Sequence, residues 1–348
     1  MLLASMSCSD EFLQVAPTDS LADSQVSTKA GIDGLLIGTY SALNGVFGNR
    51  FEGPNHWATG SVVGGDANKG TDAGDYSSLN PIQRYEASPV DPNNDFNNLW
   101  RGRYEGVSRA NKVLSAIANS TELTRWGWGF YIVVGGKVFK RPNLYQTKIG
   151  EAKDLFDDVI ENGVTSNGLK YDLLDDYAQI YNAENDNHAE AVFDVESANN
   201  TGNVQNANAF DDLNYPYNTG PDGPGNCCGF FQPSFEMANS YRTGADGLPL
   251  LDKSYNNPEN VVKNDFGLEA DEPFVEDDGP LDPRIDHAIG RRGIPYLDWI
   301  EHPGKAWIRS QPYAGPYSPK KYIYYRSQEN SFTDGSSWTR GYATMNYT

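Results

Sequence analysis

The chain has 348 residues, enough for one large domain or two modest ones, and 12% of them are aromatic. Its formal net charge of −20, from 27 basic and 47 acidic residues, argues against nucleic acid or an anionic lipid surface as a partner. No apolar stretch approaches the ~20 residues that cross a bilayer.

The first residues resemble the end of a secretory signal. Leu2 and Leu3 are followed by small residues and then by Cys8, after which comes an acidic segment at 9–11. An apolar run that passes into small residues is typical of a signal peptide before its cleavage site. From these residues alone two interpretations stay open. Cys8 is either an ordinary thiol or the lipidated residue of a bacterial lipoprotein that is cut just before it.

Apolar residues from Thr28 recur at steps of three and four, which predicts a helix that ends near "NGVFGN". A polar glycine-rich segment follows at 60–78. Its Asp66, Asn68 and Asp72 suggest a calcium loop. However, the twelve-residue calcium loop requires Gly at its sixth position and Glu at its twelfth, where this chain has Thr71 and Ser77. We therefore expect a solvated or ligand-facing loop there and no metal site.

Residues 94–120 predict the longest helix, with Asp95 placed to cap its N-terminus. Asn111 is the polar member of one face, and we expect it to pin an adjacent loop through its amide. The other members of this face are Trp100, Tyr104, Val107 and Leu114.

A third amphipathic helix is predicted at 148–163, ending at Gly163. Beyond it "AVFDVES" alternates like a short strand, and residues 199–233 are expected to form loops. Ser234 is a candidate cap of one more short helix, and the sequence after that helix is irregular and aromatic.

The cysteine count of three cannot support a disulfide framework. Neighbouring cysteines can close a strained ring, but we expect Cys227 and Cys228 to be two small buried residues in a loop. No histidine lies near that pair in the sequence, which argues against a zinc site.

Catalytic motifs are absent from the sequence: it has no Gly-x-Ser-x-Gly elbow, phosphate loop, dinucleotide fingerprint or His-Glu-x-x-His. Paired acids at 157–158, 175–176, 211–212 and 277–278 are what 47 acidic residues give by chance, although a glycosidase needs two carboxylates. The rings in the loop-like part have two interpretations. They fill an irregular core, or they stack on sugar rings. They are Tyr296, Trp299, Trp307 and Trp338.

Four segments carry a resemblance to a known family. They are Cys8 with "FLQVAPTDSLADSQV" and "LLIGTYSALNG"; "NNLWRGRYEGVSRANKVL", through Asn98, Trp100, Tyr104, Arg109, Ala110 and Asn111; "EAKDLFDDVIENG" with "EAVFDVES"; and "QPSFEMANSYRTGADGLPLLD" with "LDPRIDHAIGRRG". In this order they resemble the SusD/RagB-like outer-membrane lipoproteins.

The resemblance implies a mainly α fold in which a tetratricopeptide-like helical-repeat scaffold supports a loop-rich ligand-binding portion. It implies lipidation at Cys8, an outer-membrane location facing the cell surface, and no catalysis, cofactor or metal. The partners implied are an oligosaccharide or polysaccharide and a SusC-like TonB-dependent transporter that imports it. The alternatives are a secreted glycoside hydrolase or a non-functional fragment of a SusD-like protein.

Ligand-binding residues transfer poorly within such a family, so the site is a hypothesis about one shallow surface patch. Its members are Asp66, Asn68, Arg292, Tyr296, Trp299 and Trp338.

Two departures from the family pattern divide the chain. Residues 1–7 are expected to be the signal remnant, and 8–124 the SusD-like N-terminal region. Residues 125–145 are expected to form an atypical junction, where the family pattern implies that a block of scaffold helices is missing through a deletion or a gene-model error. Residues 146–348 form the second family-like region, which is expected to stop before the family's C-terminus. Both losses would leave apolar stripes of amphipathic helices exposed.

Overall fold

The computed structural model describes residues 23–45, 57–88, 94–120, 145–192, 195–196, 214–225, 227–334, 342–343 and 346–347. Three helices are long: α2 (Lys29–Tyr40), α5 (Asn94–Asn119) and α7 (Tyr145–Asn162). The short helices are α1 (Asp23–Val26), α3 (Ser61–Gly64), α4 (Asn80–Gln83), α8 (Phe235–Ser240), α9 (Ile285–Ala288) and α10 (Gln311–Ala314). Single 3₁₀ turns span Ser41–Asn44, Ser77–Leu79, Tyr177–Tyr181, Gly220–Asp222, Ser254–Asn256, Gly304–Trp307 and Arg326–Gln328.

The strands are short and pair antiparallel in twos. β1 (Ala67–Gly70) pairs with β3 (Phe230–Pro233), β2 (Val195–Glu196) with β8 (Asn346–Tyr347), β4 (Ile289–Gly290) with β5 (Ser318–Pro319), and β6 (Thr333–Asp334) with β7 (Tyr342–Ala343). This content agrees with the predicted mainly α class. The tetratricopeptide-like repeat stays a prediction.

The chain divides into two compact units, Met1–Ala42 with Tyr104–Lys140 and Leu43–Arg103 with Arg141–Thr348. The boundaries predicted at 8, 125 and 146 stay predictions. Cys8 and most of the atypical junction lie outside the described residues.

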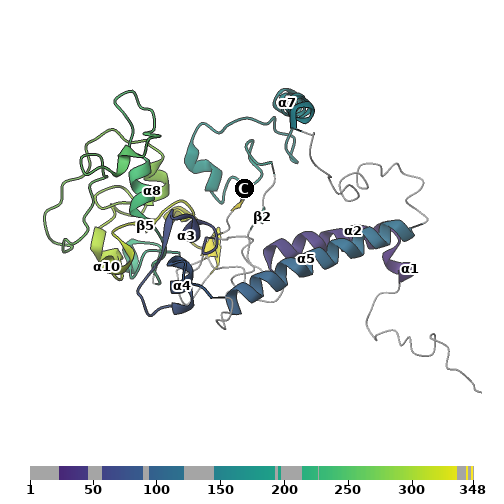
Figure 1. Ribbon diagram of the computed structural model, residues 1–348, viewed down its shortest axis with the longest axis horizontal. Coiled ribbons are helices and arrows are strands. Elements are labelled where there is room, and N and C mark those ends of the chain that lie inside the picture. The colour runs from purple at the N-terminus through teal and green to yellow at the C-terminus, as the bar shows by residue number, and fades with distance from the viewer. Residues whose placement is uncertain are drawn as a thin grey trace, which may run out of the picture. The chain divides into compact units, whose positions relative to one another are not determined.

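In the first unit α2 packs against α5 (Figure 1). Thr28 caps α2, since its hydroxyl accepts a hydrogen bond from the Gly31 amide at 3.1 Å. Ile32 is buried with Val113 from α5. At the other end of α2, Arg109 donates to the Gly38 carbonyl at 2.8 Å. This bond satisfies one of the carbonyls that a helix C-terminus leaves open, and it gives a structural reason for the arginine of the Arg-Ala-Asn motif.

The predicted helix at 94–120 is confirmed, but the face chosen for burial is wrong. Trp100 is 62% exposed and Val107 51%. Asn111 is exposed as well, so it does not pin a loop from a buried face. The buried face instead carries Val113 and Ala116. Asp95 lies in the first turn and not at the cap position.

Helix α7 also presents apolar side chains to solvent. Phe156 is 68% exposed and Ile160 64%. The helix ends before Gly163 as predicted, with the Gly163 amide donating to the Val159 carbonyl at 2.8 Å. The expected loss of scaffold helices stays a prediction.

The second unit contains the loop-rich part, in which short elements enclose buried rings (α8, α10 and β5 in Figure 1). Two strand pairs are joined at Gln232 of β3, whose buried amide donates to the Tyr317 carbonyl at 2.8 Å. The side-chain Oε1 of Gln232 accepts a hydrogen bond from the Thr71 backbone amide at 3.2 Å. The loops predicted at 60–78 and 199–233 therefore contain strands β1 and β3, which the sequence did not reveal.

Candidate functional site

A hollow of about 200 Å³ lies where the two strand pairs meet. Its apolar wall comes from β3, α8, α9 and neighbouring residues, and its polar wall from Ser61, Asp66 and the segment 320–322. The lining residues are Ser61, Asp66, Ala67, Phe231, Pro233, Met237, Ala288, Pro319, Lys320, Lys321 and Tyr322. An apolar wall opposite a few polar groups is the usual composition of a small-molecule site.

Backbone hydrogen bonds hold the rim of this hollow. The Ser234 amide donates to the Asp66 carbonyl at 2.9 Å, next to the Ala67–Pro233 pair of β1 and β3. The Lys320 amide donates to the Ala288 carbonyl at 3.2 Å. Residues that are far apart in the sequence are therefore fixed around one cavity by main-chain contacts.

Two lysines lie side by side in the sequence at this hollow, and their environments differ. The Lys320 ammonium donates to the Pro295 carbonyl at 2.5 Å, and burial lowers the pKa of Lys320 to about 8, against the opposing effect of Asp286. The Lys321 ammonium lies 4.3 Å from the ring centroid of Tyr181 and 5.9 Å from that of Tyr322. Such distances are those of cation–π contacts.

Of the residues predicted from the sequence to bind a ligand, Asp66 lines the hollow and is exposed. Asn68 lies on β1 and is engaged with the protein: its oxygen accepts from the Gly70 amide at 2.8 Å and its amide donates to the Tyr313 carbonyl at 3.4 Å. Arg292 donates to the carbonyls of Ala270 and Glu272 at 2.8 and 2.7 Å. Arg292 therefore ties a loop to the protein.

Tyr296 and Trp299 belong to the core. Tyr296 is 0% exposed and its hydroxyl donates to the Pro319 carbonyl; Trp299 is 7% exposed and donates to the Tyr324 carbonyl at 3.1 Å. Burial raises the pKa of Tyr296 well above its usual value. Neither ring has a face at the surface, so their placement corrects the expectation of exposed stacking rings. Trp307 is buried beside Tyr296, and the core interpretation holds for all three rings.

Trp338 and Cys8 lie outside the described residues, and their roles stay predictions. The residues that sequence reasoning missed are Phe231, Met237, Lys320, Lys321 and Tyr322. A signal for the last three was present in "PKKYIYY", where two adjacent lysines precede a group of tyrosines.

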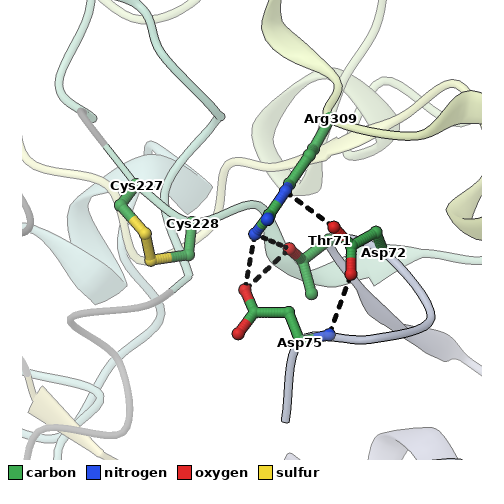
Figure 2. Close-up of a disulfide and its surroundings, with 6 residues drawn as sticks. All are labelled: Thr71, Asp72, Asp75, Cys227, Cys228 and Arg309. Atoms are coloured by element: carbon green, nitrogen blue, oxygen red, sulfur yellow. Dashed lines mark hydrogen bonds and ion pairs between the residues drawn. A yellow bond between two sulfur atoms is a disulfide. The ribbon is translucent and has the colours of Figure 1, made fainter. Parts of the chain in front are cut away.

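The glycine-rich loop binds the ammonium group of one of its own residues, Lys69. The buried Lys69 ammonium donates to the carbonyls of Asp72 and Asp75 at 2.6 and 2.5 Å, and burial lowers the pKa of Lys69 to about 8. Arg309 forms ion pairs with Asp72 at 2.9 Å and Asp75 at 2.7 Å, as Figure 2 shows. Within the described residues no group of three or more His, Cys, Asp or Glu side chains could hold a metal ion.

Cys227 and Cys228 form a disulfide with each other (Figure 2). This corrects the expectation of two separate thiols. Cys228 is buried in a cluster with Trp57 and Phe230, and Cys227 packs against the same cluster.

Each pair of acids within the described residues has at least one member with a protein partner. Asp277 pairs with Arg242 at 2.6 Å and Asp278 with Lys263 at 2.5 Å. Asp157 pairs with Lys153, and Asp176 accepts from the Ala178 amide at 2.9 Å. These carboxylates thus have structural roles, and the pair at 211–212 lies outside the described residues.

Residues 189–348 match the family model described as the SusD family. The chain is SusD/RagB-like over this range. The match contains most residues that line the hollow, including Phe231 and the segment 319–322. SusD/RagB proteins are known for binding glycans in nutrient uptake, are generally non-catalytic, and are typically surface lipoproteins of the outer membrane that work with SusC-like transporters.

The search of curated proteins found no match to this chain. In the part of the chain that the structure describes, no helix has both the length and the apolar character needed to cross a bilayer.

Proposed function

We propose that this chain is a non-catalytic glycan-binding lipoprotein, anchored through Cys8, which captures oligosaccharides at the cell surface for import through a SusC-like TonB-dependent transporter. The observation that carries the proposal is the SusD family match over 189–348, together with a hollow whose lining falls mainly in that range.

The chemistry of the hollow supports a sugar ligand. A sugar ring has an apolar C–H face, which Phe231, Met237 and the neighbouring prolines can cover. Its hydroxyls need donors and acceptors, which Ser61, Asp66 and the hydroxyl of Tyr322 can supply. The volume of the hollow, about 200 Å³, is below the roughly 300–1,000 Å³ of drug-sized sites. We therefore assign it to one part of an oligosaccharide and not to a whole chain of sugars.

The test is glycan binding by the purified full chain and by its Tyr322→Ala variant, on a glycan array and then by calorimetry. We expect at least one glycan to bind, and Tyr322→Ala to weaken it by about tenfold, the effect of losing one ring contact of 1–3 kcal/mol. Lys112→Met, an exposed change on α5, serves as the matched control.

Two results would contradict the proposal. Release of reducing sugar from a bound polysaccharide would favour a secreted glycoside hydrolase. A gradual melt of the far-UV circular dichroism signal, with no glycan bound, would favour a non-functional fragment. Binding without turnover and one sharp melting transition would support the proposed function.

A further inference from the structure

The contacts of the Lys321 ammonium are mainly with aromatic rings, whereas six other described lysines are held by oxygen atoms of the protein. Lys29, Lys153, Lys263 and Lys305 pair with carboxylates, and Lys69 and Lys320 donate to backbone carbonyls. Lys321 is partly exposed and contacts the rings of Tyr177, Tyr181 and Tyr322. Among the described residues no carboxylate forms an ion pair with it.

The three rings are held together independently of the lysine. Tyr181 packs edge-on against Tyr177 at 5.8 Å and against Tyr322 at 5.4 Å, measured between ring centroids. Burial raises the pKa of Tyr177, and the positive charge of Lys321 opposes that rise. The phenols therefore stay neutral and leave the charge of Lys321 uncompensated by any formal negative charge.

Lys320 and Lys321 also line a second, smaller hollow of about 20 Å³, whose other walls include Tyr181, His287 and Tyr325. That space holds a group about the size of a water molecule. Across both hollows the lining contains two lysines and one histidine against a single carboxylate, Asp66. The side chains that line the two hollows therefore carry more positive than negative charge, while Asp286 and Glu190 act on Lys320 and Tyr181 from outside the lining.

We infer that the ligand of this site is an acidic glycan, whose carboxylate or sulfate binds the Lys321 ammonium while a sugar ring occupies the larger hollow. This inference rests on the proposed function. A charge-assisted hydrogen bond is stronger than a neutral one. The Lys321 ammonium has three N–H donors, so its hydrogen bond with the Tyr177 hydroxyl leaves donors for such a contact. The net charge of −20 opposes an anion weakly at this range, because physiological salt screens charges beyond roughly 8 Å.

The experiment uses the purified full chain on an array of neutral, uronic-acid and sulfated glycans. Each hit is then compared by calorimetry with its neutral counterpart, a methyl ester or a desulfated form. We expect the acidic form to bind at least about tenfold more tightly, and Lys321→Met to remove that preference through a loss of about 10- to 100-fold. The two kinds of counterpart separate carboxylate from sulfate recognition.

Lys112→Met, which removes the same charge from α5, should keep the preference, and circular dichroism of Lys321→Met checks that it folds. The inference fails if only neutral glycans bind, if neutral and acidic forms bind equally, or if Lys321→Met keeps the preference. In those cases the proposed function stands when Tyr322→Ala weakens the binding. If no glycan of either kind binds, both the inference and the proposed function fail.

Discussion

The loop-rich residues 214–334 and helix α7 are stabilised in opposite ways. The loop-rich part has little regular structure, yet it buries its rings and satisfies them with side-chain hydrogen bonds, as Trp299 and Tyr296 do. Helix α7 has regular hydrogen bonds along 18 residues, yet Phe156 and Ile160 are mostly exposed. Because helices in water depend mainly on the packing of an apolar face, burial and not regularity should decide which part resists unfolding.

The largest expected effect is acid unfolding of the loop-rich part. His302 is buried between Tyr296 and Trp307, and burial lowers its pKa to about 3, with Lys320 adding to the shift. The unfolded chain binds that proton near pH 6.5. Stability is therefore complete above about pH 6.5 and falls as the pH drops towards 3, by about 5 kcal/mol in all. Near-ultraviolet circular dichroism of the buried tryptophans should follow this loss.

His302→Gln keeps a partner for the Ser318 hydroxyl, which lies 2.8 Å from the His302 ring, and removes the titration. The variant should lose most of the pH dependence between 6.5 and 4. An unchanged slope would contradict the assignment to His302.

The next effect concerns the buried ion pair of the same part. Arg242 and Asp277 are 7% and 1% exposed, and two bonds of 2.9 and 2.6 Å join them. Burial by itself would raise the pKa of Asp277, but Arg242 and two backbone amides lower it to about 2. Arg242→Ala would leave a buried charge without its partner, so we expect a loss of about 3–5 kcal/mol in the free energy of unfolding.

The matched control is Arg284→Ala, which breaks a largely exposed pair with Asp282. It should cost less than about 1 kcal/mol in urea denaturation. Equal losses in the two variants would mean that burial does not distinguish the pairs.

The smallest effect is predicted on α7. Phe156→Ala should change the free energy of unfolding by no more than about 0.5 kcal/mol, because the ring is already in water. The same substitution at Phe230, which is 2% exposed, should cost about 3–5 kcal/mol. A loss above about 2 kcal/mol at Phe156 would show that another surface covers α7 in solution.

The sequence predicted the elements that depend on local signals. The cap of α8 at Ser234 and the apolar periodicity of α2, α5 and α7 depend on residues that are close together in the sequence, whereas the cap of α2 at Thr28 was not predicted. The buried face of α5 was predicted wrongly, because apolar periodicity identifies a stripe of residues but does not show which segment covers it. Asn111 was therefore predicted to be buried, and in the structure it is exposed.

Of the residues that line the hollow, only Asp66 had been predicted from the sequence. The other walls of the hollow depend on the pairing of Asn68 with Gln232 and of Ile289 with Pro319, contacts between distant segments that no local pattern specifies. Tyr296 and Trp299 illustrate the second difficulty. The same ring suits a core and a sugar platform, and only tertiary packing decides between them.

The disulfide between Cys227 and Cys228 has a practical consequence for testing the proposed lipid anchor. The chain has three cysteines, and two of them are joined in the disulfide. Under denaturing, non-reducing conditions the only thiol left to react with a maleimide is that of Cys8. A lipidated chain would then incorporate no label and an unprocessed chain one per molecule, so simple stoichiometry reads out the chemical state of Cys8.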